Sequence, residues 1–158
     1  MATLKPAAQR VQAEADALGL DIVVRELAKS TRTAEEAAAA CGCAVAQIVK
    51  SLVFQGSETG TPYLLLVSGA NRVDEKAVAR GVGEKLLRPD AQFVRDVTGF
   101  AIGGIPPFGH AERLATFIDQ DLLAHAVVWA AAGTPNALFS VGPDALAEAC
   151  DAAVISMA

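Results

Sequence analysis

One lysine inside an apolar run, Ile48-Val49-Lys50-Ser51-Leu52-Val53-Phe54, constrains the fold of this chain more than any other feature. Because side chains alternate along a strand, Lys50 would share a face with the apolar Ile48 and Phe54. An inward ammonium is costly unless it is paired, reaches a water-filled cleft or loses its proton. The run therefore predicts a cleft beside a buried strand. Alternatively, the lysine stem packs on its neighbours and the ammonium reaches solvent at the sheet edge.

The length and composition of the chain favour one domain. Its 158 residues, 53% of them hydrophobic, suffice for a full core without metal or disulfide support, so we expect residues 1–158 to form a single domain. The longest strongly apolar run, residues 122–132, is too short for a membrane span. The N-terminus lacks the features of a signal peptide, and the odd cysteine count fits a reducing compartment. We expect a cytoplasmic protein without membrane contact.

The cysteines and histidines give little support for a metal site. Cys41-Gly42-Cys43 could bind a metal, but no second ligand pair follows at zinc-site spacing, and His110 and His125 stand alone. Small buried cysteines are the simpler interpretation, so neither a metal nor a cofactor is expected.

The charge distribution limits how the chain could contact nucleic acid. A net charge of −5 argues against non-specific coating of a polyanion. All 13 Lys and Arg lie at or before Arg113, whereas residues 114–158 contain only acidic charges. Any polyanion contact should therefore come from the first two thirds, although most of these charges are expected on solvated helix faces. The candidates are Lys50, Arg72, Lys76, Arg80, Lys85, Arg88, Arg95 and Arg113.

The order of the expected elements indicates an α+β fold. Periodicity and capping signals predict helices at 6–18, 33–41, 74–80, 89–97 and 143–150, with a short helical turn at 44–47. Strands are predicted at 21–26, 48–54, 63–67, 126–129, 137–141 and 152–155. Because strands and helices do not alternate regularly, we expect a mixed, partly barrel-like β-sheet flanked by helices.

A glycine-proline loop spans residues 98–110. Gly103-Gly104 permits close approach of the main chain to a ligand, and Pro106-Pro107 stiffens the second half of the loop. The spacing matches neither a dinucleotide turn nor a phosphate loop, and composition alone favours a structural turn. His110, at the end of the loop, could form a polar wall of a cleft or be satisfied by a backbone carbonyl. No nucleophilic triad is readable, because the serines lack a nucleophile-elbow context.

Four motifs together resemble the YbaK/EbsC family, which includes the editing domains associated with prolyl-tRNA synthetase. They are Val49–Phe54, Val67–Arg72, Gly103–His110 and Gly133–Ala137, and the resemblance covers nearly the whole chain. It implies a partial barrel flanked by helices and an aminoacyl-tRNA deacylase that acts in trans. The partner would be the 3′ end of an aminoacyl-tRNA, with tRNA for proline the leading candidate. The acidic chain predicts modest tRNA affinity unless a synthetase or elongation factor helps.

The resemblance also implies roles for particular residues. Lys50 would hold the terminal phosphate or ribose, and the backbone of Gly103 and Gly104 would orient water and the ester carbonyl. Attack by water is thought to be aided by backbone groups and the ribose hydroxyl of the substrate, so no side-chain nucleophile is required. Substrate-binding roles are implied for Ser68, Arg72, Ile105, Pro106, Gly109, His110, Gly133 and Asn136.

The sequence leaves the substrate and two other functions open. The amino acid removed could be alanine, cysteine, serine, threonine or an analogue, because one methylene changes selectivity only modestly. The chain could also hydrolyse another small acyl ester, or serve as a noncatalytic module that binds tRNA or a synthetase. Lys50 and the paired glycines favour catalysis, since a scaffold needs neither.

Overall fold

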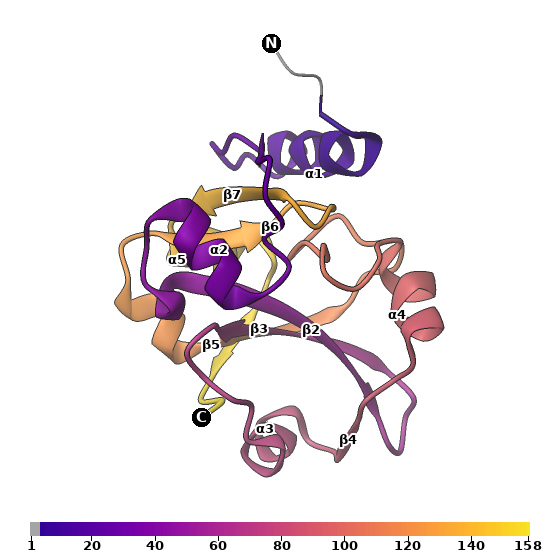
Figure 1. Cartoon of the computed structure of the whole chain (residues 1–158). Helices are drawn as coiled ribbons and strands as arrows, with labels where there is room; N and C mark the ends of the chain where they lie inside the picture. Colours follow the sequence, from indigo (N-terminus) through magenta and orange to yellow (C-terminus); the bar gives the residue numbers. More distant parts are fainter. Residues whose placement is uncertain (1–3) are drawn as a thin grey trace.

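The computed structural model describes residues 4–158 (Figure 1). Its helices are α1 (Pro6–Ala17), α2 (Ala34–Cys41), α3 (Glu75–Val82), α4 (Ala91–Thr98) and α5 (Pro143–Ala149), with short 3₁₀ turns η1 (Val45–Gln47) and η2 (Gln120–Ala124). Its strands are β1 (Arg25–Glu26), β2 (Ile48–Gly56), β3 (Pro62–Ser68), β4 (Leu86–Leu87), β5 (Ala115–Asp119), β6 (Val128–Ala131), β7 (Ala137–Val141) and β8 (Ala153–Ile155).

All the strands belong to one mixed sheet with the order β1-β7-β6-β2-β3-β5-β8, and β4 pairs with β2 beside this path. The β2–β3 hairpin is antiparallel, while β6 runs parallel to β2 and β5 runs parallel to β3. The sheet curves, with α1 lying along β7 at one end of the molecule and α3 and β4 at the other (Figure 1). The predicted α+β fold with a mixed sheet and flanking helices is confirmed.

Local capping signals set the helix that precedes β2. Thr33 Oγ1 accepts a hydrogen bond from the Glu36 amide at 3.1 Å, and the Glu36 carboxylate accepts one from the Thr33 amide at 3.3 Å. These bonds satisfy amides that the first turn leaves unpaired. The helix ends at Gly42, whose φ of 67° lies in the left-handed region that glycine tolerates best. The capped helix predicted from the sequence is therefore confirmed.

Several predicted boundaries were wrong, among them the strand expected at 126–129, which is found at Val128–Ala131. The strand expected at 21–26 is confined to Arg25–Glu26, because the preceding residues bond to a helix side chain rather than to a strand. The Gln12 amide donates to the Ile22 carbonyl at 3.0 Å, and its oxygen accepts from the Val24 amide at 2.8 Å. The helix expected from 89 begins at Ala91, since the Asp90 side chain caps it by accepting from the Phe93 amide at 2.8 Å.

Strands β4 and β5 were not predicted from the sequence. Strand β5 has only five residues and follows a long irregular loop, and its identity as a strand depends on its parallel pairing with β3 and β8. A short parallel strand of this kind shows no periodic signal in its own sequence. This omission matters because β5 ends at Asp119, which lies close to the candidate site.

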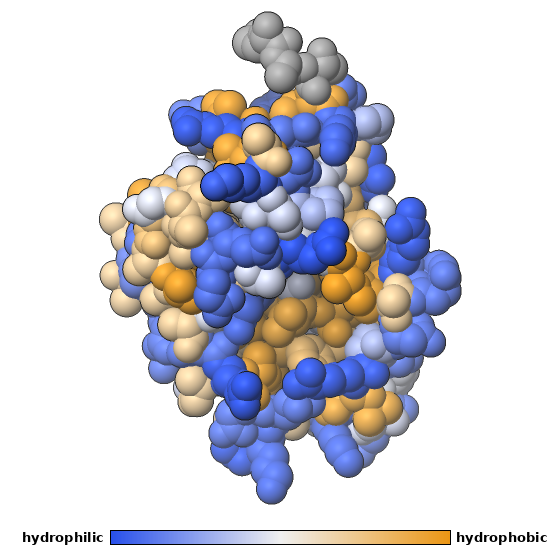
Figure 2. Space-filling model, in the orientation of Figure 1, coloured by the Kyte–Doolittle hydropathy of each residue, from blue (hydrophilic) through white to orange (hydrophobic). Residues whose placement is uncertain are grey.

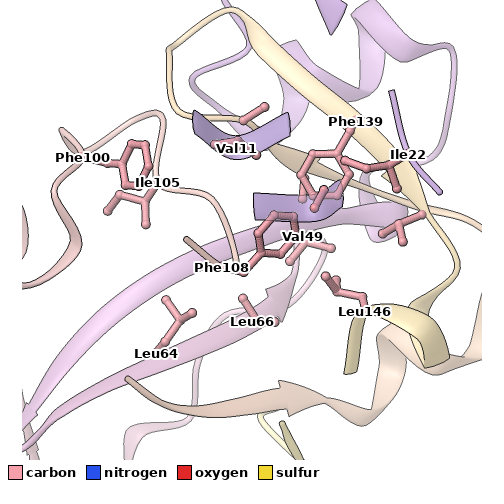
Figure 3. Close-up of a cluster of buried hydrophobic side chains, with 14 of the residues drawn as sticks. Val11, Ile22, Val49, Leu64, Leu66, Phe100, Ile105, Phe108, Phe139 and Leu146 are labelled. Carbon is pink, nitrogen blue, oxygen red and sulfur yellow. The ribbon is translucent and has the colours of Figure 1, made fainter. Parts of the chain in front are cut away.

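Strand β3 is buried on both faces and anchors the core. Leu64 and Leu66 face the larger hydrophobic cluster, whereas Leu65 and Val67 face a smaller one, and all four are fully buried. Figure 3 shows the larger cluster, to which α1 contributes Val11 and the sheet contributes Val49 and Phe139. Helices and loops therefore cover both faces of the central hairpin.

Glu84 connects the tip of the β2–β3 hairpin to the segment between α3 and β4. Its carboxylate accepts hydrogen bonds from the amides of Glu58 and Thr59 at 2.9 and 3.1 Å, and from the hydroxyls of Thr59 and Tyr63, each at 2.7 Å. The bonds from Thr59 and Tyr63 lower the pKa of Glu84 to about 2. The ionised carboxylate is thus the form that stabilises the hairpin tip.

We expect Glu84→Gln to lower the melting temperature at neutral pH, since the amide replaces a charged acceptor of four hydrogen bonds. The folded pKa of about 2 lies below the ordinary value of 4.5. The stabilisation is therefore complete above the ordinary value and is lost as pH falls toward the folded pKa. Thermal unfolding of parent and variant should show a difference that narrows over this acidic range. A difference that is independent of pH, or one matched by Glu112→Gln at an exposed position, would contradict this role.

Candidate active site

An interruption in the pairing of β2 defines the candidate site. On one side, β2 pairs with β3 from Val49 to Gln55. On its other side, it pairs with β6 only through Ile48 and Val49, and with β4 only through Gln55 and Gly56. Within the part of the chain that the structure describes, residues 50–54 therefore have no strand beside them on that side. The gap leaves room for a ligand next to the sheet.

Two cavities open along this gap. The smaller, of about 290 Å³, lies over residues 48–52 between the start of α2 and strands β6 and β7. The larger, of about 530 Å³, lies over residues 50–54 beside the loop after β3 and the segment that leads to α4. Figure 2 shows a hollow on this face, with an apolar floor and a hydrophilic rim. Residues common to both cavities are Lys50, Ser51, Leu52, Ile102 and Ile105.

Lys50 is half-buried where the two cavities meet, so the predicted cleft beside this strand is present. Its ammonium donates to the Asn71 carbonyl at 2.6 Å, which leaves two of its three N–H groups for a ligand. Burial lowers the pKa of Lys50, while the charges of Glu35 and Asp119 oppose that effect. The alternative of an ammonium released to solvent at a sheet edge is not favoured, because the ammonium bonds to the Asn71 carbonyl and lies in the walls of both cavities.

The two glycines of the loop are used differently. Gly103 lines the smaller cavity with a φ of 102°, and none of the hydrogen bonds among residues 4–158 uses its amide or carbonyl. The Gly104 amide donates to the Ala101 carbonyl at 3.2 Å, and its carbonyl accepts from the Gly133 amide at 2.8 Å. A Cβ on Gly104 would lie 2.9 Å from the backbone of Thr134. Gly103 thus offers backbone groups to a ligand, whereas Gly104 permits tight packing.

The residues after the two glycines lie mostly behind the cavities. Ile105 is buried and lines both of them, whereas Pro106 and His110 line neither. The His110 ring donates from Nε2 to the Pro106 carbonyl at 2.7 Å and packs edge-on against Phe100. Burial lowers the pKa of His110, which favours the neutral ring. The geometry supports the interpretation of a histidine satisfied by a backbone carbonyl.

Of five further residues predicted for the site, one lines a cavity and four lie in the structure around the cavities. Arg72 is exposed and lines the larger cavity. Buried Ser68 donates its hydroxyl to the Ala46 carbonyl at 2.8 Å, and Asn136 donates to the Leu27 carbonyl at 2.9 Å. Gly109 and Gly133 have left-handed φ values of 79° and 94°. Ser68, Gly109, Gly133 and Asn136 lie outside both cavity walls, and their substrate-binding roles stay predictions.

Several residues of the cavity walls were not predicted from the sequence. Ile102 is 60% exposed although it is a large apolar residue, and it borders both cavities. Its position directly before Gly103 was the only available signal. Trp129 lines the smaller cavity and is only partly buried. Arg32 lines the same cavity and packs against Gly103.

The walls of the two cavities contain no Asp, Glu, His or Cys among the residues that the structure describes. Residues 4–158 likewise bring no three metal-ligating side chains together. Burial raises the pKa of Cys41 to about 11, and it also raises that of Cys43, so both thiols stay protonated at neutral pH. None of the helices described is both long enough and apolar enough to span a bilayer.

Comparisons with known proteins identify the family of the chain. Residues 28–149 match the family described as aminoacyl-tRNA editing domain. A solved structure described as a "putative trans-editing enzyme for prolyl tRNA synthetase" is 49% identical, with a TM-score of 0.93 and 98% of each chain covered.

Two curated relatives are also similar. The "Uncharacterized protein YwhH" of Bacillus subtilis is 32% identical over 125 residues, which cover 79% of each chain. A proline–tRNA ligase of Limosilactobacillus fermentum is 30% identical over 104 residues, which make up 63% of this chain but only 18% of the ligase. The chain therefore belongs to the family of aminoacyl-tRNA editing domains and is an aminoacyl-tRNA deacylase, an ester hydrolase.

Proposed function

We propose that residues 1–158 act as one cytoplasmic trans-editing unit that removes a noncognate amino acid from tRNA, with tRNA for proline the leading candidate. The observation that carries this proposal is the Lys50 ammonium at the meeting point of a small, largely apolar cavity and a larger cavity with cationic walls. The similarity to a trans-editing protein for prolyl-tRNA synthetase supports the choice of tRNA.

The two cavities suit the two parts of an aminoacyl-tRNA end. The smaller has a largely apolar wall that includes Ala34, Ala37 and Trp129, and its volume of about 290 Å³ has room for an aminoacyl group. The larger includes Arg72 and Arg88, whose guanidinium groups pair well with phosphate. The aminoacyl group therefore enters the smaller cavity, the terminal nucleotide occupies the larger, and the ester lies beside Lys50.

The reaction needs water, an activated ester and stabilisation of the developing oxyanion. Water adds to the ester carbonyl, the bond to the ribose oxygen breaks, and the products are a free amino acid and a tRNA with its terminal hydroxyl restored. Because the cavity walls lack a carboxylate or imidazole, the neighbouring ribose hydroxyl of the substrate helps to move the proton. Lys50 anchors the phosphate or ribose, and the Gly103 backbone orients the water and the carbonyl.

Affinity for tRNA depends on help from another protein. The net charge of −5 disfavours tight independent binding to a polyanion. Similarity to part of a proline–tRNA ligase supports a synthetase as that helper, since such a ligase would bring the mischarged tRNA close to the deacylase.

Lys50→Ala should reduce kcat/KM for the edited substrate by about a hundredfold or more, because it removes the cation beside the ester. The measurement is deacylation of tRNA for proline charged separately with proline, alanine, cysteine or serine. Lys76→Ala, an exposed position on α3 outside both cavity walls, is the matched control. Full activity of Lys50→Ala would refute the role of this lysine. No release from any charged tRNA would favour another tRNA or a noncatalytic module, and activity on simple acyl esters alone would favour a general esterase.

Gly104→Ala should lower both thermal stability and deacylation, because the new methyl would press on the Thr134 backbone at 2.9 Å. The loop that carries Gly103 would have to shift. Gly81→Ala is the contrasting variant, since its methyl would meet Ile155 at an ordinary 3.4 Å within α3. Alanine in a helix is favoured over glycine by about 0.5–1 kcal/mol, so this variant should be as stable as the parent or more so. Equal behaviour of the two variants would argue against tight packing at Gly104.

Arg72→Ala should raise KM for aminoacyl-tRNA more than it lowers kcat, because it removes a phosphate contact remote from the ester. One lost phosphate contact should reduce the slope of log affinity against log salt by about 0.7. Arg113→Ala is the control, since Arg113 is exposed, pairs with Asp151 at 3.6 Å and lies outside both cavity walls. Steady-state kinetics over a salt series would measure the change, and an unaltered slope would exclude Arg72 from phosphate binding.

A further inference from the structure

Asp119 is a fully buried carboxylate that has no role in the proposed deacylation chemistry. The ion pairs among residues 4–158 join Arg88 to Glu75 and Arg113 to Asp151, so neither involves Asp119. A buried carboxylate is costly unless hydrogen bonds satisfy it. Those hydrogen bonds come from the end of β3, from the turn that follows it and from the start of η2.

Three donors hold Asp119. Its Oδ2 accepts from the Ser68 amide at 3.1 Å and from the Asn71 side-chain amide at 2.8 Å, while its Oδ1 accepts from the Asp121 amide at 3.0 Å. The Asn71 backbone amide also donates to the Ser68 carbonyl at 2.9 Å, which closes the turn. Asp119 therefore clamps the first and last residues of a four-residue turn.

That turn carries the acceptor for Lys50. The Asn71 side chain binds Asp119, and the Asn71 carbonyl accepts from the Lys50 ammonium at 2.6 Å. The sheet register explains the meeting, because Lys50 pairs with Val67 on one side of β3 while Ile118 pairs with Leu66 on the other. Lys50 and Asp119 thus approach the same end of β3 from opposite sides.

We propose that Asp119 is a positioning residue that fixes the Asn71 carbonyl and, through it, holds the Lys50 ammonium between the two cavities. This inference rests on the proposed role of Lys50 in deacylation. Asp119 lines neither cavity and touches no substrate, so it acts only through the turn and through its charge.

The charges around Lys50 support a second effect of Asp119. Burial lowers the pKa of Lys50, and the positive charge of Arg72, from the loop after β3, adds to the lowering. Glu35 from α2 and Asp119 from β5 act in the opposite direction. Glu35 is exposed and screened by solvent, whereas Asp119 is fully buried and screened less. Asp119 therefore helps to keep Lys50 protonated.

A purely structural role for Asp119 makes a different prediction. Its bond to the Asp121 amide also caps η2, so its loss could destabilise the fold without any effect on Lys50. A role limited to capping η2 predicts an unchanged Lys50 titration, whereas displacement of the Asn71 carbonyl or loss of the Asp119 charge lowers the Lys50 pKa. That titration can be measured without substrate, which separates this inference from the proposed deacylation.

The test is an NMR titration of the Lys50 Cε resonance in ¹³C-lysine-labelled protein, assigned by its loss in Lys50→Ala. In Asp119→Asn, we expect the Lys50 pKa to fall below that of the parent, and kcat/KM at neutral pH to fall by about tenfold to a hundredfold. Asp144→Asn, which removes an equal charge at an exposed position on α5, should change neither. An unchanged Lys50 titration in folded Asp119→Asn would overturn the proposal.

Asn71→Ala provides a second arm in case Asp119→Asn does not fold. It removes the side-chain bonds from Asn71 to the carboxylates of Asp119 and Asp121, each at 2.8 Å, but leaves Asp119 bonded to the Ser68 and Asp121 amides. We expect kcat/KM to fall with little change in melting temperature, and wild-type kcat/KM in this variant would also overturn the proposal. If Lys50→Ala deacylates normally, the proposed catalytic role of Lys50 fails, while the NMR titration still decides whether Asp119 controls Lys50.

Discussion

The structure depends on one interruption in β-sheet pairing. Strand β2 has a complete partner on one side, but on the other its neighbours pair only at its two ends, and residues 50–54 are left without a strand. Backbone groups in a protein interior must find partners or contact solvent, so such a gap persists only where a cavity reaches it. Both cavities open along these residues, and the half-buried Lys50 lies where they meet.

The chemistry of the site depends on what its walls contain. Backbone groups, cations and apolar or neutral polar side chains line the two cavities, and no carboxylate or imidazole is present among the wall residues described. An aminoacyl ester is already activated, so placement of the ester and water can supply much of the rate enhancement. In the proposed mechanism, the loop after β3 and the glycine loop serve one purpose, which is to hold donors at fixed positions around the ester.

Local patterns predicted much of the fold but only part of the site. The capping box at Thr33 and Glu36 and the β2–β3 hairpin could be predicted directly, because each depends on neighbouring residues. The cleft beside Lys50 was predicted from the cost of burying an ammonium. Strand β5 and Asp119 could not be found, since a short parallel strand acquires its identity from β3 and β8. His110 was ambiguous until its bond to the Pro106 carbonyl was seen.

The sequence by itself determined the α+β class, the inward position of Lys50 and the family, because alternation, capping and ordered motifs are properties of the chain alone. Only the tertiary structure decided which residues surround that lysine. Asn71 and Asp119 come from different strand ends and meet through sheet register. Gly103 and Gly104 are neighbours, yet one faces a cavity and the other packs on Thr134. Contacts between distant segments depend on packing, which local sequence does not specify.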